Sequence, residues 1–152
     1  MIGHQNRRTT AGIGVALGAL AISVALLAPG SGAAAPNGAL CQGIPATITG
    51  THGDDVLNGT KRRDVIQAGV GNDVIRGRGG NDLICAHKGD DRIFGGEGND
   101  EIHGRRGDDR LNGGIGDDRL FGDPGDDQLD GGSGTDTCET GVGFDLARNC
   151  ES

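Results

Sequence analysis

Aromatic side chains are almost absent from this sequence. Its 152 residues include three Phe and neither Tyr nor Trp, whereas glycine occupies 32 positions. Large apolar side chains fill the core of an ordinary globular domain, and glycine contributes no side chain to one. The composition therefore excludes a conventional globular core. The length fits one structural unit and leaves little room for a catalytic domain with an appended module.

The sequence also lacks a surplus of basic residues. The 14 Lys and Arg face 22 Asp and Glu, and no acid falls within residues 1–35. Without that stretch, 12 basic residues stand against 22 acidic residues, a net charge of −10. Proteins that bind nucleic acids neutralise phosphates with clustered Lys and Arg. The charge balance therefore excludes nucleic acid as a partner and favours cations.

Catalytic motifs are missing as well. The sequence contains no HExxH, GxSxG or GxxxxGK[ST] motif, and no GxGxxG followed by a helical pattern. We therefore expect a protein that is not an enzyme.

The first 35 residues have the organisation of a signal peptide. Arg7 and Arg8 precede an uncharged apolar stretch at residues 11–28, and small residues follow it up to residue 35. This order predicts export, with cleavage close to residues 33–35. An uncleaved anchor is the alternative, because 18 apolar residues reach the lower limit for a membrane span.

The four cysteines all follow this segment, at Cys41, Cys85, Cys138 and Cys150. An even number in an exported chain predicts two disulfides, and three pairings are possible. Cys138 and Cys150 enclose a short terminal loop, which favours pairing them and leaves Cys41 for Cys85.

A gapless repeat of nine residues fills most of the chain. Eleven units run from residue 50 to residue 148, with Asp at the sixth position of every unit and Gly at the fourth position of ten. The eighth position is Leu or Ile in the first nine units. Residues 36–49 keep Ile48 in register but lack the glycines and the Asp, so they are predicted to form an N-terminal cap. Residues 149–152 form a C-terminal tail that carries Cys150.

The spacing has a physical interpretation. The three residues around position eight suit a short strand with one side chain turned inward, and the other six suit a turn. Glycines permit the positive φ values of such a turn and leave carbonyl oxygens free to converge on an ion. Carboxylate and carbonyl oxygens at flexible geometry suit Ca²⁺ better than Mg²⁺ or a transition metal.

The unit resembles the GGxGxDxUx nonapeptide of the repeats-in-toxin, or haemolysin-type, calcium-binding family, and the CQG, DLIC and NCE segments resemble small secreted actinobacterial proteins built only of such repeats. The resemblance implies an all-β fold, a parallel β-roll (a right-handed β-solenoid), with two nonapeptides per coil and disulfide-tied ends. It implies up to nine Ca²⁺ ions between stacked turns of two aspartate columns. The first column contains Asp55, Asp73, Asp91, Asp109, Asp127 and Asp145, and the second contains Asp64, Asp82, Asp100, Asp118 and Asp136. The glycines assigned to the same sites are Gly71, Gly80, Gly89, Gly98, Gly107, Gly116 and Gly125.

Some turns are expected to bind calcium weakly. Arg62 replaces the fourth-position glycine and Arg63 adds a second positive charge beside Asp64, whereas Thr140 and Phe144 make the last turn irregular. The alternative for the aspartates is a series of Asx-turns without metal, which leaves eleven stacked carboxylates in mutual repulsion. The acids at position five are expected only to solvate the turns or to increase the local negative potential. The histidines and the paired arginines are expected to lie on the solvated surface.

These observations predict a secreted calcium-binding protein whose fold requires Ca²⁺ and whose mature form has no membrane segment. Two alternatives stay open, namely a cell-surface or adhesion scaffold and a calcium-binding accessory module of a secreted hydrolase. The sequence assigns no protein or cell-wall partner.

Overall fold

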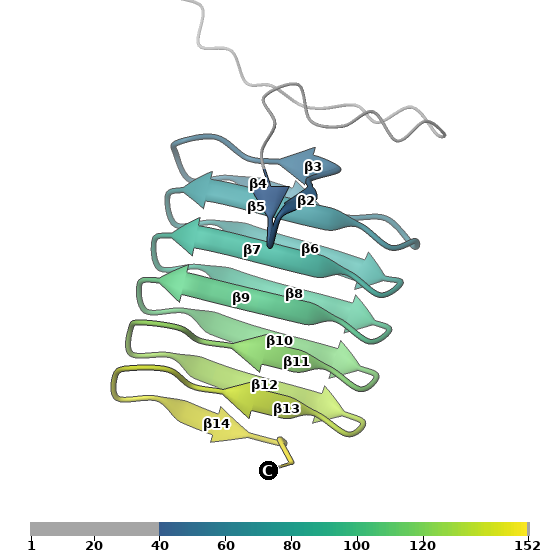
Figure 1. Cartoon of the computed structure of the whole chain (residues 1–152), viewed down its shortest axis with the longest axis vertical. Helices are drawn as coiled ribbons and strands as arrows, with labels where there is room; N and C mark the ends of the chain where they lie inside the picture. Colours follow the sequence, from purple (N-terminus) through teal and green to yellow (C-terminus); the bar gives the residue numbers. More distant parts are fainter. Residues whose placement is uncertain (1–39, 152) are drawn as a thin grey trace, which may run out of the picture. The chain divides into compact units, whose positions relative to one another are not determined.

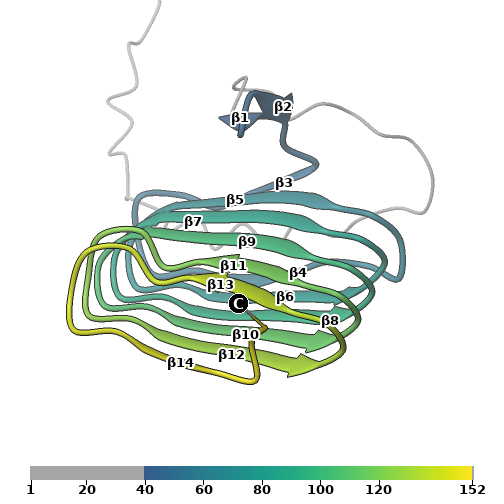
Figure 2. The same ribbon diagram turned by 60° about the horizontal axis from the view of Figure 1, so that its bottom comes forward.

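The computed structural model describes residues 40–151, and every regular element in this range is a β-strand. Two six-stranded parallel sheets face each other, and the chain alternates between them as it advances (Figures 1 and 2). One sheet contains β3 (Ile48–Thr49), β5 (Val65–Val70), β7 (Leu83–Lys88), β9 (Glu101–Arg106), β11 (Arg119–Phe121) and β13 (Thr137–Glu139). The other contains β4 (Val56–Asn58), β6 (Val74–Gly79), β8 (Arg92–Glu97), β10 (Arg110–Ile115), β12 (Gln128–Ser133) and β14 (Leu146–Arg148). The parallel β-solenoid expected from the repeat is confirmed.

Each coil contains two nonapeptides. Residues 18 positions apart pair across neighbouring strands, as Ile66 does with Ile84 and Leu111 does with Leu129. Every repeat position therefore forms a column along the solenoid, and odd and even repeats form separate columns on opposite sides.

Most strands are longer than the repeat predicts. A three-residue strand is expected around position eight, but β5 to β10 and β12 each contain six residues, because pairing continues through positions one to three of the next unit. Gly114 pairs with Gly132, and Ile115 pairs with Ser133. The turn itself is thus confined to positions four to six.

The core is a single file of aliphatic side chains between the two sheets. The position-eight side chains of eight consecutive units are at most 2% exposed, and they are Ile66, Ile75, Ile84, Ile93, Ile102, Leu111, Leu120 and Leu129. Ile48, Leu57 and Cys138 pack against this file near its ends. Burial of each such side chain stabilises the fold by about 1.5–3 kcal/mol.

The N-terminal cap packs on the outer surface of one sheet. Strands β1 (Leu40–Cys41) and β2 (Ile44–Pro45) form an antiparallel pair. Cys41 and Ala46 of the cap bury Val65, Leu83 and Cys85 in a second, smaller apolar cluster. Outward-facing apolar residues on β5 and β7 therefore explain why the cap docks there.

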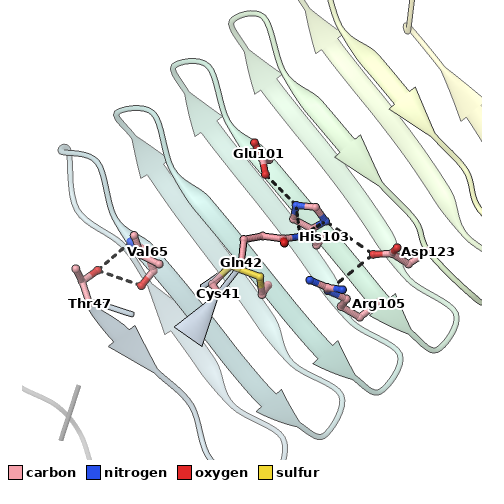
Figure 3. The surroundings of a disulfide bond; sticks show 9 residues. Cys41, Gln42, Thr47, Val65, Glu101, His103, Arg105 and Asp123 are labelled. Carbon is pink, nitrogen blue, oxygen red and sulfur yellow. Dashed lines mark hydrogen bonds and ion pairs between the residues drawn. A yellow bond between two sulfur atoms is a disulfide. The ribbon is translucent and has the colours of Figure 1, made fainter. Parts of the chain in front are cut away.

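Both disulfides have the predicted pairing. Cys41 is bonded to Cys85, which joins the cap to β7 (Figure 3), and Cys138 is bonded to Cys150, which joins β13 to the C-terminal tail. The two cross-links therefore tie the two ends of the solenoid.

The predicted signal peptide falls on residues 1–35, outside the described residues. Within residues 40–151, the structure contains no helix with the length and apolar character needed to span a membrane.

Candidate calcium-binding turns

The position-six aspartates form two columns at the turns. Nine of them are buried, although carboxylates are among the side chains least often buried without a partner. These nine are Asp64, Asp73, Asp82, Asp91, Asp100, Asp109, Asp118, Asp127 and Asp136. Asp55 and Asp145 lie at the two ends of the first column and are partly exposed. The structure therefore brings together all eleven aspartates in the arrangement that the repeat predicts.

One oxygen of nine of these carboxylates, from Asp73 onward, belongs to a ladder that links the coils. The backbone N–H of Asp55 donates to Oδ1 of Asp73, and the N–H of Asp64 donates to Oδ1 of Asp82. The same bond recurs every 18 residues up to Asp145, with N···O distances of 2.7–2.9 Å. Oδ1 therefore has a defined structural role without any metal.

The other oxygen has no partner in eight of the turns. Oδ2 is buried and accepts no hydrogen bond in Asp73, Asp82, Asp91, Asp100, Asp109, Asp118, Asp127 and Asp136. A buried polar atom without a partner is unfavourable, and a buried carboxylate oxygen especially so. These eight atoms are therefore the strongest indication that the turns take a cationic ligand.

The first two turns differ from the rest. Oδ2 of Asp55 accepts hydrogen bonds from the backbone N–H and the hydroxyl of Thr51, at 2.6 and 2.9 Å. Oδ2 of Asp64 accepts the same pair from Thr60, at 2.7 and 2.9 Å. A threonine at position two thus satisfies the oxygen that the later turns leave without a partner.

The conformation of Arg62 also distinguishes the second turn from the later turns. The sequence predicts strain at Arg62, because glycine adopts positive φ at the fourth position of the later turns. Arg62 does not adopt positive φ, and its N–H donates to the Thr60 hydroxyl. The turn therefore avoids the strain by taking another conformation.

The fourth-position glycines shape the turns from the third unit onward. Gly71, Gly80, Gly89, Gly98, Gly107, Gly116 and Gly125 all have φ between 97° and 155°. A Cβ at Gly71 would approach the carbonyl carbon of Gly53 to 2.5 Å. Glycine is therefore needed at this position both for its conformation and for the close approach of successive coils.

The first-position glycines lie beside the unpartnered oxygens, and the sequence analysis did not assign them. A Cβ at Gly95 would collide with Oδ2 of Asp100, and it would lie 2.6 Å from the carbonyl oxygen of Gly113 in the next coil. Gly104 stands in the same relation to Asp109 and Gly122. Each such turn therefore places a carboxylate oxygen and a backbone carbonyl of the next coil around one glycine. The frequent occurrence of glycine at position one of the repeat is the sequence feature that could have identified these residues.

Position five carries a second ladder that the sequence analysis did not foresee. The side chain of each Asn or Asp there accepts the backbone N–H of the same position in the next coil, at 2.8–3.1 Å. The acceptors are Asp54, Asn72, Asn81, Asp90, Asn99, Asp108, Asp117 and Asp126. Because asparagine serves as well as aspartate, the role of this position is to accept a hydrogen bond. The last of these bonds, to the N–H of Phe144, keeps the irregular final turn in the stack.

Glu151 ends the second column. The N–H of Asp136 donates to the Glu151 carboxylate, which takes the place of the aspartate that a further coil would supply. Cys150, the preceding residue, is bonded to Cys138. The disulfide therefore holds Glu151 at the end of the ladder.

Burial raises the pKa of the aspartates in the middle of both columns. The pKa is raised to about 8 for Asp109, about 7 for Asp100, and about 6 for Asp82, Asp91 and Asp127. Loss of water around the carboxylate is the largest cause. The hydrogen bond from the neighbouring backbone N–H opposes it, and adjacent carboxylates add to it. The columns are therefore unfavourable places for negative charge unless a cation is present.

The donor set fits calcium. Among residues 40–151, no group of three or more His, Cys, Asp or Glu side chains converges as a metal cluster. A metal at these turns must therefore combine carboxylate oxygens with backbone carbonyls. Oxygen ligands of these two kinds in a flexible turn suit Ca²⁺, which accepts six to eight of them.

Comparison with protein families also indicates calcium binding. Residues 47–84, 86–120 and 112–147 match the family described as RTX calcium-binding nonapeptide repeat (4 copies). The chain belongs to this family. The match extends over both RTX aspartate columns and the file of buried Ile and Leu. No curated protein and no solved structure matches the chain.

Proposed function

We propose that this RTX-repeat chain is an exported, non-catalytic calcium-binding protein whose turns bind several Ca²⁺ ions and whose fold depends on them. The observation that carries the proposal is the set of eight buried Oδ2 atoms without a hydrogen-bond partner. When bound, Ca²⁺ supplies positive charge that neutralises the carboxylates and joins successive coils.

Each ion would be held by the position-six aspartates together with backbone carbonyls of the turns. The aspartates are those of the two columns, and the fourth-position glycines Gly71 to Gly125 hold the backbone in the required left-handed conformation. The first-position glycines keep the space beside Oδ2 free of side chains. The chain thus provides both the ligands and the room around them.

The nine predicted gaps between stacked turns are not equivalent. Thr51 and Thr60 already satisfy Oδ2 of Asp55 and Asp64. Arg63 also acts on the second gap, because its charge opposes the rise in the pKa of Asp82. We therefore assign weak binding to the gaps 55–73 and 64–82 and to the gap 127–145, where the last turn is irregular and Asp145 is partly exposed, and stronger binding to the six others.

Export is supported by two features of the chain. Disulfides persist in oxidising compartments and are rare in the cytosol, and the structure contains two of them. The apolar stretch at residues 11–28, which follows Arg7 and Arg8, has the order of a signal peptide. We therefore place the mature protein outside the cytoplasm, with the domain boundaries at about residues 35, 49 and 148.

Isothermal titration calorimetry of the metal-free full chain with CaCl₂ and with MgCl₂ tests the proposal. We expect several Ca²⁺ ions to bind, with dissociation constants of about 10⁻⁴–10⁻³ M as in other extracellular modules. Mg²⁺ is expected to bind much more weakly, because it prefers a rigid octahedral site. Equal binding of the two ions, or no binding of Ca²⁺ in this range, would contradict the proposal.

A further inference from the structure

A groove lies on one sheet, where β5, β7 and β9 end. It has a volume of about 920 Å³ and is lined by residues from five successive coils. Its charged, imidazole and amide side chains are His52, Gln67, His87, Lys88, Arg105, Arg106 and Asp123. The volume lies in the range of pockets that hold small ligands.

The groove contains every buried side-chain polar atom of residues 40–151 that lacks a hydrogen-bond partner, apart from the eight aspartate oxygens. These atoms are Gln67 Oε1, His87 Nε2, Arg105 Nε and Asp123 Oδ2. Arg105 Nε lies 4.0 Å from Asp123 Oδ2, close enough for an ion pair but too far for a hydrogen bond (Figure 3). Four such atoms in one groove indicate that a ligand completes their hydrogen bonds.

Three of these residues also adopt a strained backbone conformation, and one of them is Asp123, with φ of 69° at repeat position two. His87 and Arg105 have φ of 88° and 82°, at repeat position two, where Gly69 and Gly96 have φ of 120° and 122°. Side chains are rarely found at such φ values, and strain of this kind is concentrated at functional sites. Glycine would relieve the strain, so the basic side chains are present despite a local destabilisation.

The register concentrates positive charge along the groove. Lys88 pairs with Arg106 in the parallel strands β7 and β9, and Arg105 precedes Arg106 in the chain. Burial, and then the charge of Arg105, lowers the pKa of His87, which pairs with Arg105, so this imidazole adds no positive charge. Like charges side by side on neighbouring strands destabilise a sheet, and this chain has a net charge of −8. A bound anion would remove the repulsion.

We propose that this groove binds an acidic oligosaccharide. Arg105, Lys88 and Arg106 attract its carboxylates, and Gln67 Oε1 and Asp123 Oδ2 accept hydrogen bonds from its hydroxyls. A simple oxyanion would leave Gln67 Oε1 without a donor and would be repelled by Asp123, whereas a carboxylated sugar offers both kinds of group. Five coils at a strand spacing of about 4.8 Å form a track of about 19 Å, which suits an extended chain of sugars.

Calorimetry with tetragalacturonate tests the proposal on the calcium-saturated protein. CaCl₂ is kept at the same excess in the cell and in the syringe, so that chelation by the probe cancels. The variants are Arg105→Gly and His87→Gly, and the matched control is Arg78→Gly. Arg78 has φ of 81° at position two of the opposite sheet and does not line the groove. We expect at least a tenfold loss of affinity in the first two variants and no change in the control.

The thermal midpoint provides a second readout. All three glycine variants are expected to unfold at a higher temperature than the parent, because each relieves positive φ. The double variant Lys88→Gln/Arg106→Gln alters only exposed charges and is expected to weaken binding without lowering the midpoint, because it also removes the repulsion between these two paired side chains. Absence of binding to the parent, equal affinity in Arg105→Gly and Arg78→Gly, or equally tight binding of neutral maltotetraose would overturn the proposal. Displacement of the probe by equimolar sulfate would also overturn it, because the groove would then be a site for simple oxyanions.

Discussion

At the scale of single residues, the two carboxylate oxygens of a position-six aspartate have different environments. This difference explains why the repeat requires Asp. Oδ1 accepts a backbone N–H from the preceding coil in every turn from Asp73 onward, and at position five Asn likewise accepts a backbone N–H, there from the following coil. Oδ2 is the atom that distinguishes position six, because it is buried beside a glycine and a carbonyl. The requirement for aspartate therefore arises from the unpartnered, charged oxygen.

Replacement of a single aspartate by asparagine separates the hydrogen bond that Oδ1 accepts from the negative charge at Oδ2. Asp100→Asn retains Oδ1 but removes the charge from a central turn, so we expect a loss of calcium affinity of about tenfold or more, equivalent to about 1.4 kcal/mol or more. Asp64→Asn is the matched control, because Thr60 already occupies Oδ2 there. Calorimetry measures both. Equal losses in the two variants would show that the early and central turns bind calcium alike.

The raised pKa values predict two opposite responses to pH. The folded aspartates hold protons that the unfolded chain releases near pH 4, so without calcium the free energy of unfolding falls as the pH rises from about 4 towards 8. Ca²⁺ must displace these protons, so its affinity rises over pH 6–8, by about tenfold per pH unit for each proton displaced. Calcium titrations at pH 6, 7 and 8 test the second response. An affinity that is independent of pH would show that the central aspartates are already ionised.

At the scale of strands and turns, the sequence predicted the features that are encoded within the repeat. It missed the features that arise from contacts with the next coil. The inward Ile and Leu follow from position in the nonapeptide. The two aspartate columns follow from the family resemblance, and both disulfides follow from the short loop between Cys138 and Cys150, which leaves Cys41 for Cys85. The six-residue strands, the position-five ladder and Glu151 arise from contacts between residues 15–18 positions apart. Such contacts become visible only when the coils are stacked. His87 and Arg105 were assigned to the solvated surface, because the histidines show no ligand spacing in the repeat and acids are interspersed among the arginines.

The two disulfides are expected to differ in their contribution to stability. Cys41 and Cys85 are separated by 44 residues, and Cys138 and Cys150 by 12. From the chain entropy of the unfolded state, loss of the first cross-link lowers the free energy of unfolding by about 4 kcal/mol and loss of the second by about 3 kcal/mol. Urea denaturation of Cys41→Ala/Cys85→Ala and Cys138→Ala/Cys150→Ala in saturating calcium measures both. A larger loss of stability in Cys138→Ala/Cys150→Ala would indicate that holding Glu151 in place contributes more to stability than the length of the closed loop.

At the scale of the whole solenoid, stability is shared between an apolar file and two charged columns. Each strand contributes only one side chain to the file of eight buried Ile and Leu. The glycine-rich turns lose much conformational freedom on folding. Stacked carboxylates repel one another at strand spacing. Each coil contacts only its neighbours, so an ion bound between two turns would stabilise the whole array through those contacts.

The central claim is that calcium is a ligand required for folding, and removal of calcium tests it most directly. Far-ultraviolet circular dichroism and limited proteolysis are recorded on the disulfide-intact protein with 10 mM CaCl₂, and again after chelation with EGTA. We expect the β-type spectrum and the protease resistance to disappear together on chelation and to return on addition of Ca²⁺, but not of Mg²⁺. A chelated protein that keeps its β-type spectrum and its resistance to proteolysis would contradict the account.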